Sequence, residues 1–308
     1  MFYTHEENQK ESVKMTKFIN YSSIENSYRQ KEINTIRELG FHKVEWVATE
    51  KVHGANFSLW NIDGQVVPGK RSGFADGSFY GCQSIVESLT PKVKAVGMTI
   101  FGEIFGHGVQ KGVNYGPKRF AAFDILDGEK YINYDKFVEL CNTNGIDRCV
   151  EIARGSFEDL LQIDATFVTK MSVNETTDIA EGFVMKPVDD LYYPNGSRVI
   201  LKKKTEKFQE KCTGPKPKID ITLTDSQQSL LNLAASYVNQ ERVESAISKY
   251  GEDVKFPTVL GEVLKDIHGE LLKDEEVDIS TWNSINKQVC SLISPIIRAK
   301  LFGGFTAT

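Results

Sequence analysis

Apolar and polar positions along the chain follow two different periods. Up to about residue 204, short apolar runs alternate with turn residues, which is typical of β-strands. Strands are predicted at 44–47, 57–60, 99–103, 120–125, 182–185 and 197–201. Helical spacing predicts helices at 24–39, 82–96, 134–144 and 156–163. Ser22 and Glu25 have the spacing of a capping box that would begin the first of these helices, and Gly40 would end it. The pattern predicts an α+β fold with antiparallel sheets and flanking helices.

The last third of the chain has helical spacing throughout. Two prolines and a glycine in the lysine-rich segment before it predict a linker at 211–223. Thr224 and Gln227 have capping-box spacing. Helices are predicted at 224–250, 258–272 and 281–300, the last of them broken near Pro295. We therefore predict an N-terminal extension at 1–20, a first domain at 21–210, the linker, and a small all-helical domain at 224–308.

Composition places the chain among soluble globular proteins. Its 308 residues are enough for two domains. The hydrophobic share of 40% and the charged share of 26% are ordinary for such a protein. No apolar run approaches the length of a membrane span, and the first twenty residues lack the apolar segment of a secretory signal. We expect no membrane partner and a cytoplasmic location, in the host cytoplasm if a virus encodes the protein. The five scattered cysteines indicate reduced thiols, and the dispersed histidines do not favour structural zinc.

Charge is distributed unevenly. The net charge is −5, but residues 202–218 hold seven lysines and two glutamates, a local charge of +5 that leaves −10 for the remainder. A basic segment in an acidic protein indicates either a contact with an anionic partner or a solvated lysine-rich linker. Charge alone favours the linker.

Polar residues recur at the ends of the predicted strands. They are Glu50 with Lys51, Lys70 with Arg71, Glu103, Asp124, Glu181, and Lys202 with Lys204. Lys51 is followed closely by Gly54, which leaves little bulk around it. A lysine becomes a nucleophile only as the neutral amine, and nearby cations disfavour the ammonium form. Lys202 and Lys204 are two residues apart and point to the same side of an extended strand. Each residue alone is more often a solvated rim residue, so only the combination predicts a site.

In this order the segments resemble the motifs of the covalent nucleotidyltransferases, which include polynucleotide ligases and capping enzymes. The segments are Lys51-Val52-His53-Gly54, Phe101-Gly102-Glu103, Phe123-Asp124, Glu181 to Lys186, and Leu201 to Lys204. DNA ligases and capping enzymes usually have Asp where His53 stands. The form that runs from Glu50 to Phe57 is similar to the phage-type RNA ligase 2 family and to the trypanosome RNA-editing ligases. The resemblance extends from about residue 21 to about residue 250, with a shortened segment between Asp124 and Glu181 and no counterpart for residues 1–16.

The resemblance implies a nucleotidyltransferase (ATP-grasp-like ligase) domain that acts as an ATP-dependent RNA ligase. Lys51 would attack the α-phosphorus of ATP and become lysyl-AMP, AMP would pass to a 5′-phosphate RNA end, and a 3′-hydroxyl would then close the bond. Lys202 and Lys204 would stabilise charge on the α-phosphate. Glu181 would position Mg²⁺, or Mn²⁺, directly or through water.

The same resemblance implies the other residues of the nucleotide site. Phe123 would stack on adenine, although a plain core phenylalanine is an equal alternative. Arg71 and Glu103 match ribose and phosphate contacts, and Glu50 and Lys186 match adenine-side contacts. His53 and Asn56 match residues near the phosphates, without a role that the sequence assigns.

The expected partner is an RNA duplex with a nick, with an RNA/DNA hybrid left open, bound by a monomer. Helices instead of a β-barrel after Thr224 favour the RNA ligase 2 type. Arg242 and Lys249, with residues 202–218, would then contact the RNA backbone. The alternative is that residues 251–308 only cover the core. Two alternatives stay open: a capping-type guanylyltransferase, and a nucleic-acid-binding protein of the same fold that has lost catalysis.

Overall fold

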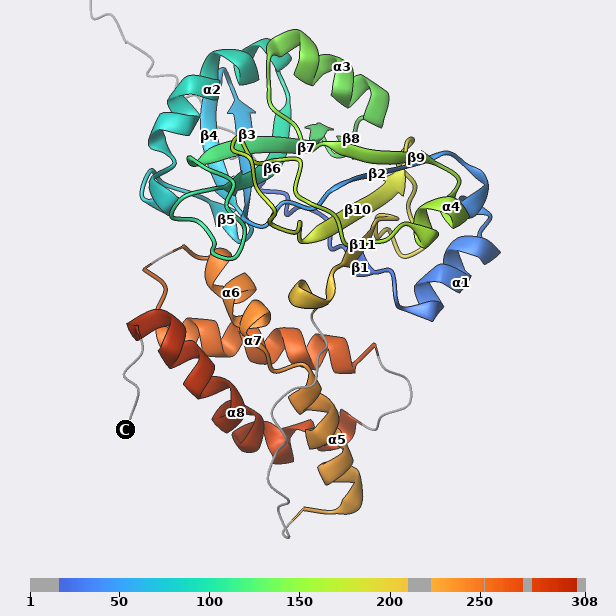
Figure 1. The fold of residues 1–308 in the computed structure, drawn as a ribbon, viewed down its shortest axis with the longest axis vertical. Helices are drawn as coiled ribbons and strands as arrows, with labels where there is room; N and C mark the ends of the chain where they lie inside the picture. The colour runs from blue at the N-terminus through green and yellow to red at the C-terminus, as the bar shows by residue number, and fades with distance from the viewer. Residues whose placement is uncertain (1–16, 210–222, 252, 274–278, 304–308) are drawn as a thin grey trace, which may run out of the picture.

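The computed structural model describes residues 17–209, 223–251, 253–273 and 279–303. Two β-sheets with flanking helices form one part, and helices α5 to α8 form another that adjoins it through α6 and α7 (Figure 1). Residues 1–16 of the extension expected at 1–20 lie outside the described residues, as does the expected linker except for residue 223.

The first part holds eleven strands. They are β1 (Glu25–Asn26), β2 (Trp46–Glu50), β3 (Ala55–Ile62), β4 (Gln65–Lys70), β5 (Gly73–Phe74), β6 (Thr99–Phe105), β7 (Arg119–Asp127), β8 (Lys130–Tyr131), β9 (Glu151–Gly155), β10 (Gly182–Pro187) and β11 (Leu201–Lys204). Its helices are α1 (Gln30–Glu38), α2 (Gln83–Val96), α3 (Tyr134–Asn144) and α4 (Phe157–Gln162). The predicted helices at 82–96, 134–144 and 156–163 are thereby confirmed.

The strands form two sheets that face each other. One has the order β5-β4-β3-β6-β7-β8 and is antiparallel throughout. The other has the order β1-β11-β10-β2-β9 and is antiparallel except for the parallel pair of β1 and β11. Helices α2 and α3 pack on the outer face of the first sheet, and α1 and α4 on the outer face of the second. The α+β fold with antiparallel sheets is confirmed.

Strand alternation decides which side chains enter the space between the sheets. On β10, Phe183 and Met185 join the outer core with α1 and α4, so Val184 and Lys186 turn inward. On β11, the outer-facing Lys203 donates to the carbonyl oxygens of Leu161 and Ile163 at the end of α4, at 2.8 and 2.7 Å. Lys202 and Lys204 therefore face inward together, as their spacing predicted.

Three details differ from the sequence-based expectation. The first helix begins at Gln30, because the Glu25 and Ser27 amides donate to Ile200 and Lys202 and so join the sheet instead of a helical turn. The strand expected at 197–201 lies at Leu201–Lys204 instead. The last helix is not broken at Pro295 but continues to Phe302.

The helical part has its own core. Its helices are α5 (Asp225–Ser236), α6 (Gln240–Ser248), α7 (Phe256–Leu271) and α8 (Trp282–Phe302). The capping box at Thr224 and Gln227 is confirmed, since both of its hydrogen bonds are present at the start of α5. Leu230, Val263 and Ile293, from three of the helices, are fully buried in one cluster. Within the described residues, no helix is long and apolar enough to cross a membrane.

Candidate active site

A cavity of about 330 Å³ lies between the inner faces of the sheets, and α6 and α7 contribute to its wall. All eleven residues that the sequence predicted for the site line this one cavity: Glu50, Lys51, His53, Asn56, Arg71, Glu103, Phe123, Glu181, Lys186, Lys202 and Lys204. They come from β2, β3, β6, β7, β10, β11 and the ends of these strands, except Arg71, which follows β4. The cavity has the size of a small-molecule site.

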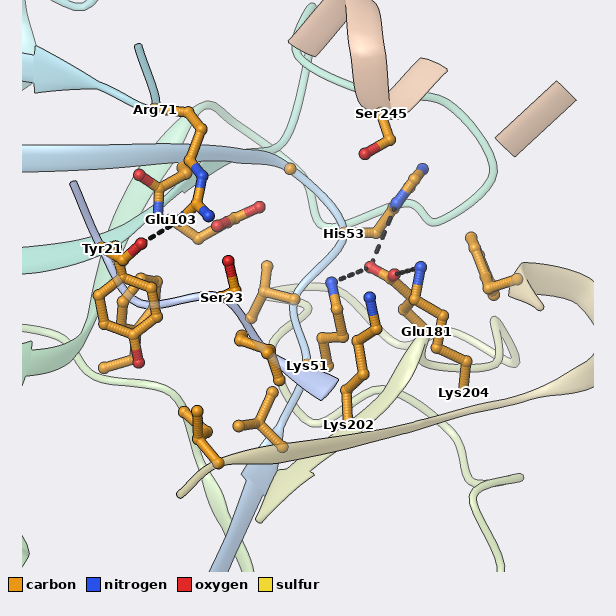
Figure 2. Close-up of a pocket in the computed structure, with 18 of the residues that line it drawn as sticks. Tyr21, Ser23, Lys51, His53, Arg71, Glu103, Glu181, Lys202, Lys204 and Ser245 are labelled. Carbon is orange, nitrogen blue, oxygen red and sulfur yellow. Dashed lines mark hydrogen bonds and ion pairs between the residues drawn. The ribbon is translucent and has the colours of Figure 1, made fainter. Parts of the chain in front are cut away.

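The centre of the cavity is a carboxylate shared by several cations. Glu181 Oε2 lies 2.9 Å from Lys51 Nζ and 3.4 Å from His53 Nδ1, and its Oε1 lies 2.9 Å from Lys204 Nζ. Figure 2 shows Lys202 beside Lys51, with its side chain directed toward the same space. Burial opposes the ionisation of Glu181, but Lys204, Lys51 and His53 hold its pKa well below the usual value.

Two glycines allow this convergence. Gly54 follows the nucleophile candidate, and a Cβ there would lie 2.3 Å from the carbonyl oxygen of Ile104 on β6. Gly182 follows Glu181 with φ of 141°, and a Cβ there would lie 2.0 Å from the carbonyl oxygen of Lys203. Larger residues would push β3 from β6 and β10 from β11. The glycines therefore set how closely Lys51, Glu103 and Lys204 approach one another.

Glu103 lies on the inner face of β6, opposite Asn56 in the register of β3. Burial raises its pKa to about 8, while Lys51 opposes the shift and the Glu181 carboxylate adds to it. Glu181 and Glu103 thus differ in charge near neutral pH: Glu181 is ionised and Glu103 is mostly protonated. A protonated carboxyl can donate a hydrogen bond to a ligand.

His53 is held through its backbone and through its ring. Its backbone amide donates to the hydroxyl of Tyr115 at 2.9 Å, and its ring packs on Phe208 with a centroid distance of 4.9 Å. Its Nε2 is buried and has no hydrogen-bond partner. Tyr115 was not predicted, because an isolated aromatic residue in a glycine-rich loop carries no local signal of its role.

The adenine-side candidates fall into two environments. Phe123 packs against the ring of Tyr21 at 4.7 Å and lines the cavity, and Lys186 donates to the Phe123 carbonyl at 3.1 Å. Glu50 is instead held by the protein: its carboxylate accepts hydrogen bonds from Thr169 Oγ1 and, at 2.7 Å, from the Lys170 amide.

A buried ion-pair network lies behind these residues. Asp124 accepts from Arg198 at 2.7 and 3.0 Å and from Tyr21 at 2.6 Å, and it also pairs with Lys186. The Tyr21 carbonyl in turn accepts from Arg71. Tyr21 and Arg198 lie within the span of the resemblance, outside its five motif segments, and nothing in the sequence indicated that they meet.

The site suits a divalent metal bound mainly through its ligand. Among the described residues, no three His, Cys, Asp or Glu side chains are arranged to hold an ion by themselves. Both oxygens of Glu181 are already paired with lysines, so a direct bond to metal would displace one of them. Mg²⁺ commonly uses one or two carboxylates together with nucleotide phosphates and water. Glu181 acting through water fits that mode.

Two family models match the sequence. The RNA ligase model matches residues 44–204, which hold every strand of the two sheets except β1 and all eleven site residues. The chain belongs to the RNA ligase family. A model of the C-terminal part of T4 RNA ligase 2 matches residues 222–300, the helical part. The resemblance to the phage-type RNA ligase 2 family is thereby confirmed, and as a family member the protein is an ATP-dependent RNA ligase.

Curated relatives agree with this assignment. Mitochondrial RNA-editing ligase 2 of Trypanosoma brucei brucei is 27% identical over 354 residues, covering 85% of each chain. RNA-editing ligase 1 of Trypanosoma brucei brucei is 24% identical over 270 residues, covering 65% of this chain and 58% of that protein. The structure of an RNA ligase of Naegleria gruberi matches 62% of this chain and 56% of its own, with a TM-score of 0.50 and 16% identity. That last likeness supports the fold alone.

Proposed function

We propose that this RNA ligase joins 3′-hydroxyl and 5′-phosphate RNA ends at nicks or bridged breaks in a duplex, through lysyl-AMP and RNA-adenylate. The observation that carries the proposal is the convergence of Lys51 and Lys204 on one buried carboxylate, with Lys202 beside Lys51, in a nucleotide-sized cavity. We further propose that it acts as a monomer in the cytoplasm.

In the first step, the neutral amine of Lys51 attacks the α-phosphorus of ATP. A nitrogen–phosphorus bond forms, the bond to the β-phosphate oxygen breaks, and pyrophosphate leaves with that electron pair while the amine loses its proton. Lys51 must leave Glu181 to do this. Lys204 and His53 stay beside Glu181, so the buried carboxylate keeps a partner when Lys51 is no longer a cation.

The other cavity residues bind and orient the nucleotide. Lys202 and Lys204 point at the space where charge gathers on the α-phosphate, and such fixed cations stabilise a transition state without reorganising. Phe123 stacks on the base and Lys186 lies behind it, while Arg71 and Glu103 contact ribose and phosphate. A bound Mg²⁺ or Mn²⁺ would neutralise phosphate charge.

Labelled nucleotides test the proposal directly. The protein is incubated with α-labelled ATP or GTP and analysed on a denaturing gel. We expect label from ATP alone, and sealing of an RNA/RNA nick with release of AMP. Label from GTP alone would identify a capping-type guanylyltransferase, and no label from either would identify a binding protein of the same fold. Nicks in RNA/RNA, RNA/DNA and DNA/DNA duplexes, tested side by side, define which strands are accepted.

Lys202→Ala is expected to slow formation of lysyl-AMP about 10²–10³-fold at saturating ATP and Mg²⁺, because one fixed cation at the α-phosphate is lost. Lys203→Ala is the matched control on the same strand. Lys203 faces outward and binds two carbonyls of α4, so its loss lowers stability by about 1–3 kcal/mol and leaves the adenylylation rate unchanged. Equal rates for Lys202→Ala and the wild type would contradict the role of Lys202.

Glu103→Gln is expected to change how stability depends on pH. The Glu103 carboxyl keeps its proton up to about pH 8 in the folded protein, whereas its ordinary pKa is 4.5. The wild type therefore loses stability as pH rises from about 4.5 to 8, because only the unfolded chain gives up this proton. Glutamine has no such proton. The Tm of the variant should rise relative to that of the wild type between pH 5 and pH 8, by about 2–4 °C per kcal/mol. Parallel Tm profiles would refute the shifted pKa.

A further inference from the structure

The turn that carries Lys51 and His53 is held through its backbone. The Lys51 amide donates to the Gly182 carbonyl at 2.9 Å, which joins the turn to β10. The His53 amide donates at 2.9 Å to the hydroxyl of Tyr115, a residue of the loop between β6 and β7. Tyr115 is not among the residues that line the cavity. Any effect of Tyr115 on the reaction must therefore pass through a residue that does line it.

The Tyr115 side chain is buried and its ring has a fixed place. It is 2% exposed, and its ring packs edge-on against Phe105 of β6 with a centroid distance of 5.1 Å. Burial raises the pKa of the hydroxyl above its usual value, and the Glu181 carboxylate adds to the shift. The hydroxyl therefore stays neutral over the pH range of a ligase assay, and its bond to His53 does not change with pH.

The backbone beside Tyr115 is fixed by the segment 172–178. The loop between β6 and β7 holds four glycines with positive φ, so its path depends on contacts from outside the loop. The Asn114 amide donates to Asp178 Oδ2 at 2.7 Å, and Ser172 Oγ donates to the Asn114 carbonyl at 3.0 Å. These bonds hold the residue next to Tyr115 from two sides, so the hydroxyl reaches His53 from a fixed support.

The contact between His53 and Glu181 is sensitive to where the His53 backbone lies. Nδ1 of the ring is 3.4 Å from Glu181 Oε2, the oxygen that also contacts Lys51 (Figure 2). That distance is near the outer limit of a hydrogen bond, so a small displacement of the backbone breaks the contact. Lys51 must leave Glu181 before it attacks ATP, and His53 is one of the partners that then remain.

We propose that Tyr115 is a positioning residue for self-adenylylation: its hydroxyl holds the His53 backbone so that the imidazole stays beside Glu181 while Lys51 leaves that carboxylate. The inference rests on the proposed function. Without the hydroxyl, the His53 amide has no acceptor from this loop, and the ring moves away from Glu181. Such a change slows the chemical step, while the residues that bind the base and the ribose keep their places.

Tyr115→Phe keeps the ring and removes the acceptor. We expect the rate of lysyl-AMP formation at saturating ATP to fall about 10-fold, because a buried donor loses its partner, and the KM for ATP to stay unchanged. Tyr134→Phe is the matched control, since Tyr134 is also 2% exposed but lies in the outer core of the first sheet. A Tyr115→Phe variant with the wild-type rate, or one that loses rate and affinity for ATP together, would overturn the proposal.

A double-mutant cycle shows whether the effect passes through the His53 side chain. The His53→Ala variant has no imidazole to position, so adding Tyr115→Phe to it should slow labelling by less than about two-fold more. Single-turnover labelling from ATP measures these slow variants. A full additional loss in the His53→Ala background would mean that Tyr115 acts on Lys51 or on the fold as a whole, which contradicts the proposal.

Imidazole NMR signals give a readout that does not depend on activity. The His53 signals are identified by their absence in His53→Ala. They should shift in Tyr115→Phe and stay in place in Tyr134→Phe, and unmoved signals in Tyr115→Phe would refute the positioning even if its rate were lower. Absence of label from ATP in the wild-type protein would instead refute the proposed function, and the NMR comparison would still decide whether Tyr115 places His53.

Discussion

Lys51→Ala is expected to abolish transfer of AMP from ATP to the protein, a loss of about 10⁴-fold or more that is typical when a catalytic nucleophile is removed. The fold should survive the change, because Glu181 keeps Lys204 and His53 as partners and no buried charge is left alone. The measurement is the rate of label incorporation from ATP, with thermal unfolding as a check that the variant is folded.

A second substrate makes this result specific. In the proposed sequence of steps, a nick that already carries AMP on its 5′-phosphate needs no lysyl-AMP. The Lys51→Ala variant should therefore still close such a pre-adenylylated nick, although it cannot use ATP to close an ordinary one. Sealing of the ordinary nick with ATP would show that another group is the nucleophile. Loss of both activities would show that Lys51 also serves the last step.

The sequence predicted the members of the site better than their surroundings. Every candidate sits at a strand end or on an inward strand face, where the alternation of side chains is readable from a few neighbouring residues. The pair Lys202 and Lys204 is the clearest case, since their spacing alone placed them on the same side and away from Lys203. The family resemblance supplied the order of the segments, which local patterns could not.

Long-range contacts are what the sequence could not provide. Tyr21 meets Asp124 across 103 positions, and Arg198 meets it across 74. The false capping box at Ser22 has the same cause: its spacing is that of a helix start, but the backbone that follows it pairs with β11, a strand near residue 200. The placement of α7 beside Glu25 and Arg29 is a further long-range contact. Local propensity is a weak guide wherever a distant strand competes for the same backbone groups.

Asp124→Asn is expected to destabilise the protein by about 3–5 kcal/mol, the usual effect of breaking a buried ion pair from one side. Asp124 is 1% exposed and is the shared partner of two buried cations, Arg198 and Lys186. Burial opposes its ionisation, but Arg198 and Lys186 hold its pKa well below the usual value. An asparagine leaves Lys186 without its paired carboxylate and leaves Arg198 with Asp190 alone. Chemical unfolding at neutral pH measures the difference in free energy of unfolding.

Asp135→Asn is the matched control, because Asp135 also pairs with an arginine, Arg154, but 57% of its side chain is exposed. Such surface pairs typically contribute about 0.2–1 kcal/mol. The Asp124 variant should also bind ATP more weakly, because Asp124 holds Tyr21 and the Tyr21 carbonyl holds Arg71 at the cavity. If both variants lost the same small amount of stability and bound ATP equally well, the buried network would be dispensable, and the placement of Arg71 would have to depend on other contacts.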